Sequence, residues 1–171
     1  METKVTSPAV KGALLALVLI VFSLGSYFSG QSQNKSLSYI AFLLFAVAII
    51  LSCTYYSKQK NGNITFGNAF ADGFKTTAAA TAISLVYTYL ALKFIMPDMI
   101  DMAIEDARKT MDSNKNMTPE QVDKSMSMMQ NYFVPFAIGG ALFMYLLTGV
   151  IASLIGAAIA KKNPAPTPFE Q

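Results

Sequence analysis

The stretch LSYIAFLLFAVAIILSCTYY, residues 37–56, is the most hydrophobic part of the chain and decides its fold class. A helix needs about 20 apolar residues to cross a hydrocarbon core of roughly 30 Å. This stretch has that length and contains no charged side chain. It therefore predicts a transmembrane helix.

Three further apolar stretches have the same character. They cover residues 12–29, 76–96 and 133–160. The whole chain is 53% hydrophobic and 13% charged, whereas soluble domains carry about 25% charged residues. These numbers predict an all-α membrane protein with four transmembrane helices. The fourth stretch exceeds a perpendicular span, so we expect it to tilt, to bend near Gly139 and Gly140, or to begin outside the bilayer.

The first apolar stretch also has some features of a cleavable signal peptide, because Lys4 and Lys11 precede it and Ser23 and Gly25 are small. Its apolar run continues past that position to Phe28 without an A-x-A pattern. A retained membrane anchor is the simpler interpretation.

Basic residues indicate the orientation, because they accumulate in the cytoplasmic segments of membrane proteins. One side of the predicted bundle collects most of the lysines: Lys4, Lys11, Lys58, Lys60, Lys75, Lys161 and Lys162. The other side holds Lys35 and the segment 97–131, which is rich in acidic residues. We therefore predict that both termini are cytoplasmic.

The segment 97–131 shows two amphipathic helices joined by a polar turn. The first has an apolar stripe of Ile100, Ile104, Ala107 and Met111. In the sequence TPEQ, Thr118 fits a helix cap, Pro119 a first helical residue and Gln121 a capping box. A second stripe follows, made of Val122, Met126, Met129 and Phe133. We predict an extracytoplasmic helical hairpin between the third and fourth spans.

Residues 65–75 predict a short amphipathic helix before the third span, lying at the interface or leading straight into the span. Asn61-Gly62 is a turn signal and Thr65 can cap a helix. Phenylalanines then recur every four residues, at Phe66, Phe70 and Phe74. On the polar side Asp72 and Lys75 are spaced to pair with each other.

The pattern GNITFGNAFADGF, followed by a span that ends at a proline, a charged helical insert and a last helix ending SLIGAAIAKK, resembles a known family. It is similar to small four-helix inner-membrane proteins of Bacteroidota labelled "domain of unknown function 4199". The resemblance covers nearly the whole chain and is most specific at Gly62, Phe66, Gly67, Ala69, Phe70, Gly73 and Phe74. It implies a multi-pass protein of the cell inner membrane and implies no activity.

The residue inventory excludes several chemistries. The chain has no histidine, no tryptophan and one cysteine, Cys53, so disulfide frameworks and His/Cys metal sites are absent. The chain has no run of basic residues of the kind that binds nucleic acid, so we expect no nucleic-acid partner. Without a nucleophile–base arrangement or a phosphate-binding glycine loop we expect no enzyme activity and no cofactor.

Clustered methionines suggest a Cu(I)-binding site, since Cu(I) prefers thioether ligands. Met99, Met102 and Met128 lie off the apolar stripes of their helices and are the candidate ligands. Irregular helix packing is the stronger interpretation of these residues, because methionine fills irregular gaps well.

Two features of the spans bear on function. Thr77, Thr81, Ser84 and Thr88 form a hydroxyl stripe that a pore could use, although helix packing explains it more simply. No acid or base falls deep within a predicted span, which argues against ion-coupled transport.

The fourth span offers small residues on neighbouring faces, among them Gly149, Ser153, Ala157 and Gly156. They permit close helix contact within the bundle or with a second copy of the chain. We predict one integral-membrane domain, residues 1–163, and a disordered tail, residues 164–171. The predicted role is a membrane accessory or scaffold protein whose partners are the lipid bilayer and a second copy or another membrane protein. The alternative is a small channel or transporter subunit, and Cu(I) binding is the weaker one.

Overall fold

The computed structural model describes residues 5–32, 34–113 and 118–162. Within these ranges the chain forms five α-helices, α1 to α5, and one π-helical turn, η1. Their bounds are α1 Pro8–Phe28, α2 Lys35–Gln59, α3 Phe66–Leu90, η1 Ala91–Ile95, α4 Asp98–Asp112 and α5 Pro119–Ile159. No strand occurs in the described ranges. The all-α prediction is confirmed, and the predicted tail, residues 164–171, lies outside the described residues.

Among the described helices, four are long and apolar enough to cross a membrane: α1, α2, α3 with η1, and α5. All four predicted spans are therefore present, but their bounds differ from those expected. The first two begin earlier, and α3 begins at Phe66 rather than at residue 76. The predicted amphipathic segment 65–75 is the first part of α3 and leads straight into the span.

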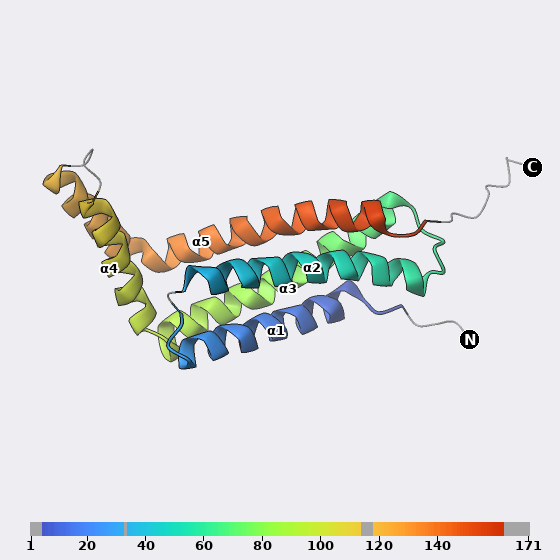
Figure 1. The fold of residues 1–171 in the computed structure, drawn as a ribbon, viewed down its shortest axis with the longest axis horizontal. Coiled ribbons are helices and arrows are strands. Elements are labelled where there is room, and N and C mark those ends of the chain that lie inside the picture. The colour runs from blue at the N-terminus through green and yellow to red at the C-terminus, as the bar shows by residue number, and fades with distance from the viewer. Residues whose placement is uncertain (1–4, 33, 114–117, 163–171) are drawn as a thin grey trace, which may run out of the picture. The chain divides into compact units, whose positions relative to one another are not determined.

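The chain divides into two compact units, which are described separately. Unit 1 comprises Met1–Ser84 with Phe143–Gln171, and unit 2 is Leu85–Leu142. In unit 1 the ribbons of α1, α2, α3 and the later part of α5 run side by side (Figure 1). Their core includes Leu15, Leu19, Phe45, Ile49, Ala80 and Ala152. Large apolar side chains also cover the outside, for example Leu14, Leu43 and Ile151, as expected of helices that face lipid.

The helices of unit 1 begin and end at recognisable caps. Ser7 Oγ accepts a hydrogen bond from the backbone N–H of Val10 at 3.3 Å, and Pro8 is the first residue of α1. After α2, Asn61 and Gly62 both have positive φ. The N–H of Gly62 donates to Ser57 O at 2.9 Å and that of Asn61 to Lys58 O at 3.0 Å. This pair of bonds is a Schellman motif, which ends α2 and turns the chain toward α3.

Unit 2 contains η1, α4 and the first part of α5. Thr118 and Gln121 form the predicted capping box: Thr118 N–H donates to Gln121 Oε1 at 2.9 Å, and Gln121 N–H donates to Thr118 Oγ1 at 3.3 Å. Arg108 of α4 also pairs with Asp123 of α5, with Nη2 and Oδ1 3.4 Å apart. The acidic residues Asp98 and Asp101 occupy the first turn of α4, as the helix dipole favours.

The break in α5 lies at Tyr132, where φ is −122° and ψ is 17°. A bend near Gly139 and Gly140 is one of the three alternatives expected for the fourth stretch, but both residues lie in regular helix. Pro135 explains the actual position, since a proline inside a helix removes one backbone hydrogen bond and clashes with the carbonyl four residues earlier. α5 thus consists of two helical segments that meet at a kink at Tyr132, and the second segment, which ends at Ile159, covers most of the predicted fourth span.

Candidate functional site

The strongest concentration of polar chemistry in unit 1 is an ion pair between Lys11 of α1 and Asp72 of α3. Lys11 Nζ donates to Asp72 Oδ2, and the two side chains are only 9% and 4% exposed. Charges are expensive to remove from water, so a buried pair persists only where it is well bonded. The pair lies within the candidate spans, and Asp72 bonds Lys11 rather than the predicted Lys75.

Two hydroxyl side chains complete the bonding of Asp72. Ser52 Oγ of α2 donates to Asp72 Oδ2 at 3.1 Å and lies 3.2 Å from Thr76 Oγ1. Thr76 Oγ1 in turn donates to the backbone carbonyl of Asp72 at 2.8 Å. We call Lys11, Ser52, Asp72 and Thr76 the polar cluster. It joins three helices, α1, α2 and α3, through hydrogen bonds and one ion pair.

Glycines let the helices approach closely around the polar cluster. A Cβ added to Gly12 would lie 2.6 Å from Ala79 Cβ and 2.8 Å from Thr76 O. A Cβ added to Gly73, beside Asp72, would lie 2.5 Å from Cys53 Sγ and 2.8 Å from Ser153 Oγ. Such distances are far shorter than any normal contact, so both positions require glycine. The first lets α1 reach α3, and the second brings α2, α3 and α5 together.

A second set of polar contacts joins the helix ends on the same side of unit 1. Thr6 N–H donates to Gln59 Oε1 at 3.1 Å, and Gln59 Nε2 donates to Thr6 Oγ1 at 3.0 Å. Ser57 Oγ donates to the carbonyl of Lys161. The segment before α1, the end of α2 and the end of α5 are thus tied together. Both described chain ends consequently lie at one end of unit 1.

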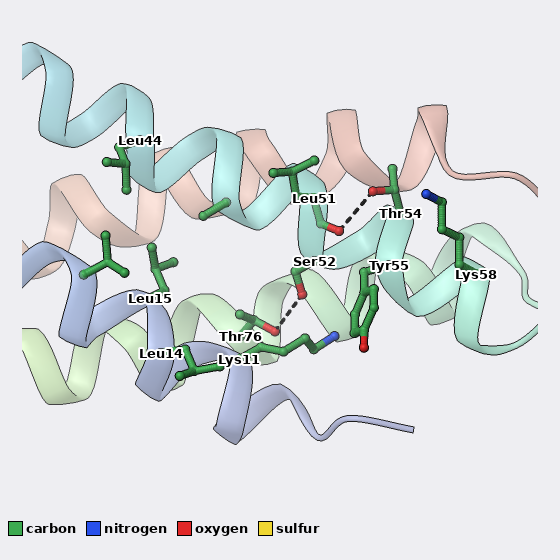
Figure 2. A pocket seen from close by; sticks show the side chains of 12 residues that line it. Lys11, Leu14, Leu15, Leu44, Leu51, Ser52, Thr54, Tyr55, Lys58 and Thr76 are labelled. Carbon is green, nitrogen blue, oxygen red and sulfur yellow. Dashed lines mark hydrogen bonds between the residues drawn. The ribbon is translucent and has the colours of Figure 1, made fainter. Parts of the chain in front are cut away.

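An open groove of about 500 Å³ runs beside the polar cluster. Its apolar lining comes from α1 and α2: Leu14, Leu15, Val18, Leu44, Ala48 and Leu51. The polar lining residues are Lys11, Ser52, Thr54, Tyr55, Lys58 and Thr76. Figure 2 shows Leu14, Leu15 and Leu44 toward one end, and Lys11, Tyr55 and Lys58 toward the other. The groove therefore has an apolar end and a basic end.

The residues that carry the family resemblance have individual structural roles. Gly62 is buried with φ of 77° and completes the Schellman motif. Ala69 is fully buried and packs with Ile64, Ala157 and Ala160. The rings of Phe70 and Phe74 stack with centroids 6.0 Å apart. Phe66 and Gly67 are exposed, and nothing but Thr65 Oγ1, at 3.9 Å, lies near a Cβ added to Gly67.

The small residues singled out in the fourth span face the inside of unit 1. Gly149, Ser153, Gly156 and Ala157 are all buried. A Cβ added to Gly149 would collide with the side chain of Thr77, and one added to Gly156 would lie 2.9 Å from Cys53 Sγ. The structure therefore uses this face of α5 for contact with α2 and α3 of the same chain.

The candidate metal ligands lie in unit 2. Met99 and Met102 of α4 are partly buried, whereas Met128 of α5 is 52% exposed. Met128 lies before the kink at Tyr132, and Met128, Tyr132 and Phe136 are all exposed. Among the described residues no group of three His, Cys, Asp or Glu side chains could hold a metal ion. Cu(I) binding by methionines stays a prediction.

The polar cluster is the feature that the sequence interpretation missed. Lys11 and Asp72 fell just outside the predicted spans 12–29 and 76–96, so neither was treated as an intramembrane charge. A usable signal was present, because Lys11, Leu15 and Leu19 recur every four residues and therefore share one helix face. Leu15 and Leu19 belong to the core, so Lys11 on that face needed a buried partner.

Comparison with known proteins assigns most of the chain to one family. No curated protein and no solved structure matches the chain. The family model described as "Protein of unknown function (DUF4199)" matches residues 11–162. That range includes every helix that could cross a membrane apart from the first turn of α1. The chain, with its buried Lys11–Asp72 pair, belongs to the DUF4199 family of proteins of unknown function.

Proposed function

We propose that the protein is a multi-pass inner-membrane protein that acts as a non-enzymatic accessory or scaffold protein. The observation that carries the proposal is the division of polar and apolar side chains in unit 1. Buried polar groups bond one another across α1, α2 and α3, while large apolar side chains are turned outward. Such a bundle presents its outer surface to lipid or to a membrane partner.

The proposed topology has both termini in the cytoplasm and the segment 97–131 on the opposite side as a helical hairpin. Four spans bring the chain ends to one side of the membrane, in agreement with the bonds that join Thr6 to Gln59 and Ser57 to Lys161. The lysines Lys58, Lys60, Lys75, Lys161 and Lys162 belong to that end, and basic residues favour the cytoplasmic side.

The role as an accessory protein is tested by site-specific photo-crosslinking in the native membrane. A photoreactive residue placed at Phe136, an exposed position of α5, is expected to yield a defined crosslinked product with a membrane protein or a second copy. The same residue at Ala157, which is buried, serves as the matched control and should yield none. Lipid adducts alone at Phe136 and at several other outward positions would contradict the accessory role.

A small channel or transporter subunit is the second candidate. The observation that favours it is a set of buried hydroxyls, Thr77 and Thr81 of α3 and Ser153 of α5, without a hydrogen-bond partner among the described residues. Buried hydroxyls usually find partners, and a permeating polar solute would supply them. A decrease in solute flux into proteoliposomes on Thr77→Val and Thr81→Val would support a pore. Flux that neither substitution changes would exclude a pore that uses these hydroxyls.

A further inference from the structure

The groove beside the polar cluster has the chemistry of a site for one amphipathic molecule. Its apolar end is made by leucine, valine and alanine side chains of α1 and α2. On α2, Leu51, Thr54, Tyr55 and Lys58 are spaced at three or four residues, so they follow one face of the helix from apolar to basic. A ligand that fits this lining has a hydrocarbon chain at one end and a polar group at the other.

The basic residues at one end of the groove indicate that the polar group of the ligand carries a negative charge. Lys11 and Lys58 line the groove and no acidic residue does. Asp72 neutralises Lys11, but Lys58 forms no ion pair with any residue in the ranges 5–32, 34–113 and 118–162. One positive charge thus remains uncompensated at the groove. The long side chain of Lys58 can lie along apolar surface while its ammonium reaches the headgroup region.

The length of the groove matches one leaflet of a bilayer. From Leu44 to Lys58 the axis of α2 rises about 21 Å at 1.5 Å per residue. Half of the hydrocarbon core is roughly 15 Å thick, so the remaining distance reaches into the headgroup region. The basic end also belongs to the end of unit 1 where Thr6 and Gln59 meet. A lipid of the leaflet on that side would have its acyl chain among the leucines and its phosphate near Lys58.

We propose that this groove is a binding site for an anionic glycerophospholipid of the surrounding bilayer. The acyl chain would pack against Leu14, Val18 and Leu44, and the phosphate group would be bound by Lys58 with Tyr55 beside it. The inference rests on the proposed insertion of the chain in a membrane. It goes beyond that proposal by naming the lipid class, the residues and the leaflet end at which the lipid is held.

The chain contains no tryptophan, so one introduced tryptophan reports on its own surroundings. Leu51→Trp places the probe in the groove, and Leu43→Trp places it on an outward position of the same helix that does not line the groove. The purified full chain is reconstituted in phosphatidylcholine vesicles. Phosphatidylglycerol with brominated acyl chains, which quenches tryptophan on contact, is added in increasing fraction, and phosphatidylcholine with the same chains serves as the comparison lipid.

The Leu51→Trp probe is expected to reach half-quenching at a fraction of anionic lipid about fivefold below that of the zwitterionic lipid, the effect of one lysine near an anionic headgroup. The Leu43→Trp probe should respond equally to both lipids. Adding Lys58→Gln should abolish the preference, while Lys58→Arg and the matched change Lys60→Gln should preserve it.

Three results would contradict the proposed lipid-binding site. Equal quenching of the Leu51→Trp probe by both lipids would show an inserted protein with no selective groove. Equal loss of preference from Lys58→Gln and Lys60→Gln would show only general attraction to surface charge. Absence of quenching by either lipid, at both probe positions, would contradict membrane insertion itself and with it the proposed function.

Discussion

The two units of this protein use ion pairs in opposite ways. In unit 1 Lys11 and Asp72 are almost completely buried and share hydrogen bonds with Ser52 and Thr76. In unit 2 Arg108 and Asp123 are 56% and 71% exposed and lie 3.4 Å apart. A buried charge that loses its partner is strongly destabilising, whereas an exposed pair contributes little because water solvates both groups. The buried ion pair is therefore expected to stabilise the helix arrangement of unit 1, whereas the exposed pair is expected to contribute little to the stability of unit 2.

The largest effect is expected from Asp72→Asn. The change keeps the shape of the side chain but leaves the Lys11 ammonium buried without a counter-charge, which typically costs about 3 to 5 kcal/mol. The free energy of unfolding, measured by SDS titration of the detergent-solubilised protein with helical circular dichroism, should fall by that amount. A loss below about 1 kcal/mol would mean that water reaches Lys11.

A smaller effect, about 1 to 3 kcal/mol, is expected from Gly73→Ala, because a methyl group there overlaps Cys53 Sγ and Ser153 Oγ. Gly67→Ala in the same helix is the matched control, since only Thr65 Oγ1, at 3.9 Å, is near the new methyl group. Alanine has the higher helix propensity, so this control should be neutral or slightly stabilising. Equal losses in the same SDS titration would show that close packing at Gly73 is not the cause.

Asp123→Asn should change the free energy of unfolding by less than about 1 kcal/mol, because its partner Arg108 is exposed and stays hydrated. Repeating the titration at high salt should reduce the difference further, since salt screens exposed pairs. A loss as large as that of Asp72→Asn would remove the contrast between the two units.

The smallest effect concerns pH. A hydrogen bond from Lys109 and its positive charge lower the pKa of Glu105 on the exposed surface of α4. A lowered carboxyl pKa contributes stability that is present above the usual pKa of glutamate and is lost as the pH falls through the lowered value. Glu105→Gln should therefore slightly flatten the acid side of the stability–pH curve of the full chain. A steeper acid side in the variant would contradict the assignment.

Local signals in the sequence account for most of the helix ends and for the number of spans. The capping box at Thr118 and Gln121, the cap at Thr65 and the turn at Asn61-Gly62 each depend on neighbouring residues, and the structure has all three. For the long fourth stretch, a bend near Gly139 and Gly140 is one of three alternatives that the sequence allows, because glycine permits bending. Pro135, which forces a bend, decided the position instead.

The candidate site was not predictable from local patterns, because it joins positions 61 residues apart in the chain. Asp72 has Lys75 one turn away, and spacing alone favours that pair. In the structure Asp72 does not pair with Lys75, because the Asp72 side chain is buried in the bundle whereas Lys75 is exposed. Only the arrangement of α1 against α3, made possible by Gly12, shows that Lys11 is the partner. The groove likewise depends on how α1 and α2 lie together.

The central claim is that Lys11 and Asp72 stabilise the bundle as a pair, and a double-mutant cycle tests it most directly. Lys11→Met, Asp72→Asn and the double variant are compared with the unchanged protein by SDS titration. Coupled neighbours in one buried network show interaction energies of about 0.5 to 3 kcal/mol, and we predict a value of about 2 kcal/mol or more for this pair. Additive losses, with coupling below about 0.5 kcal/mol, would contradict the claim.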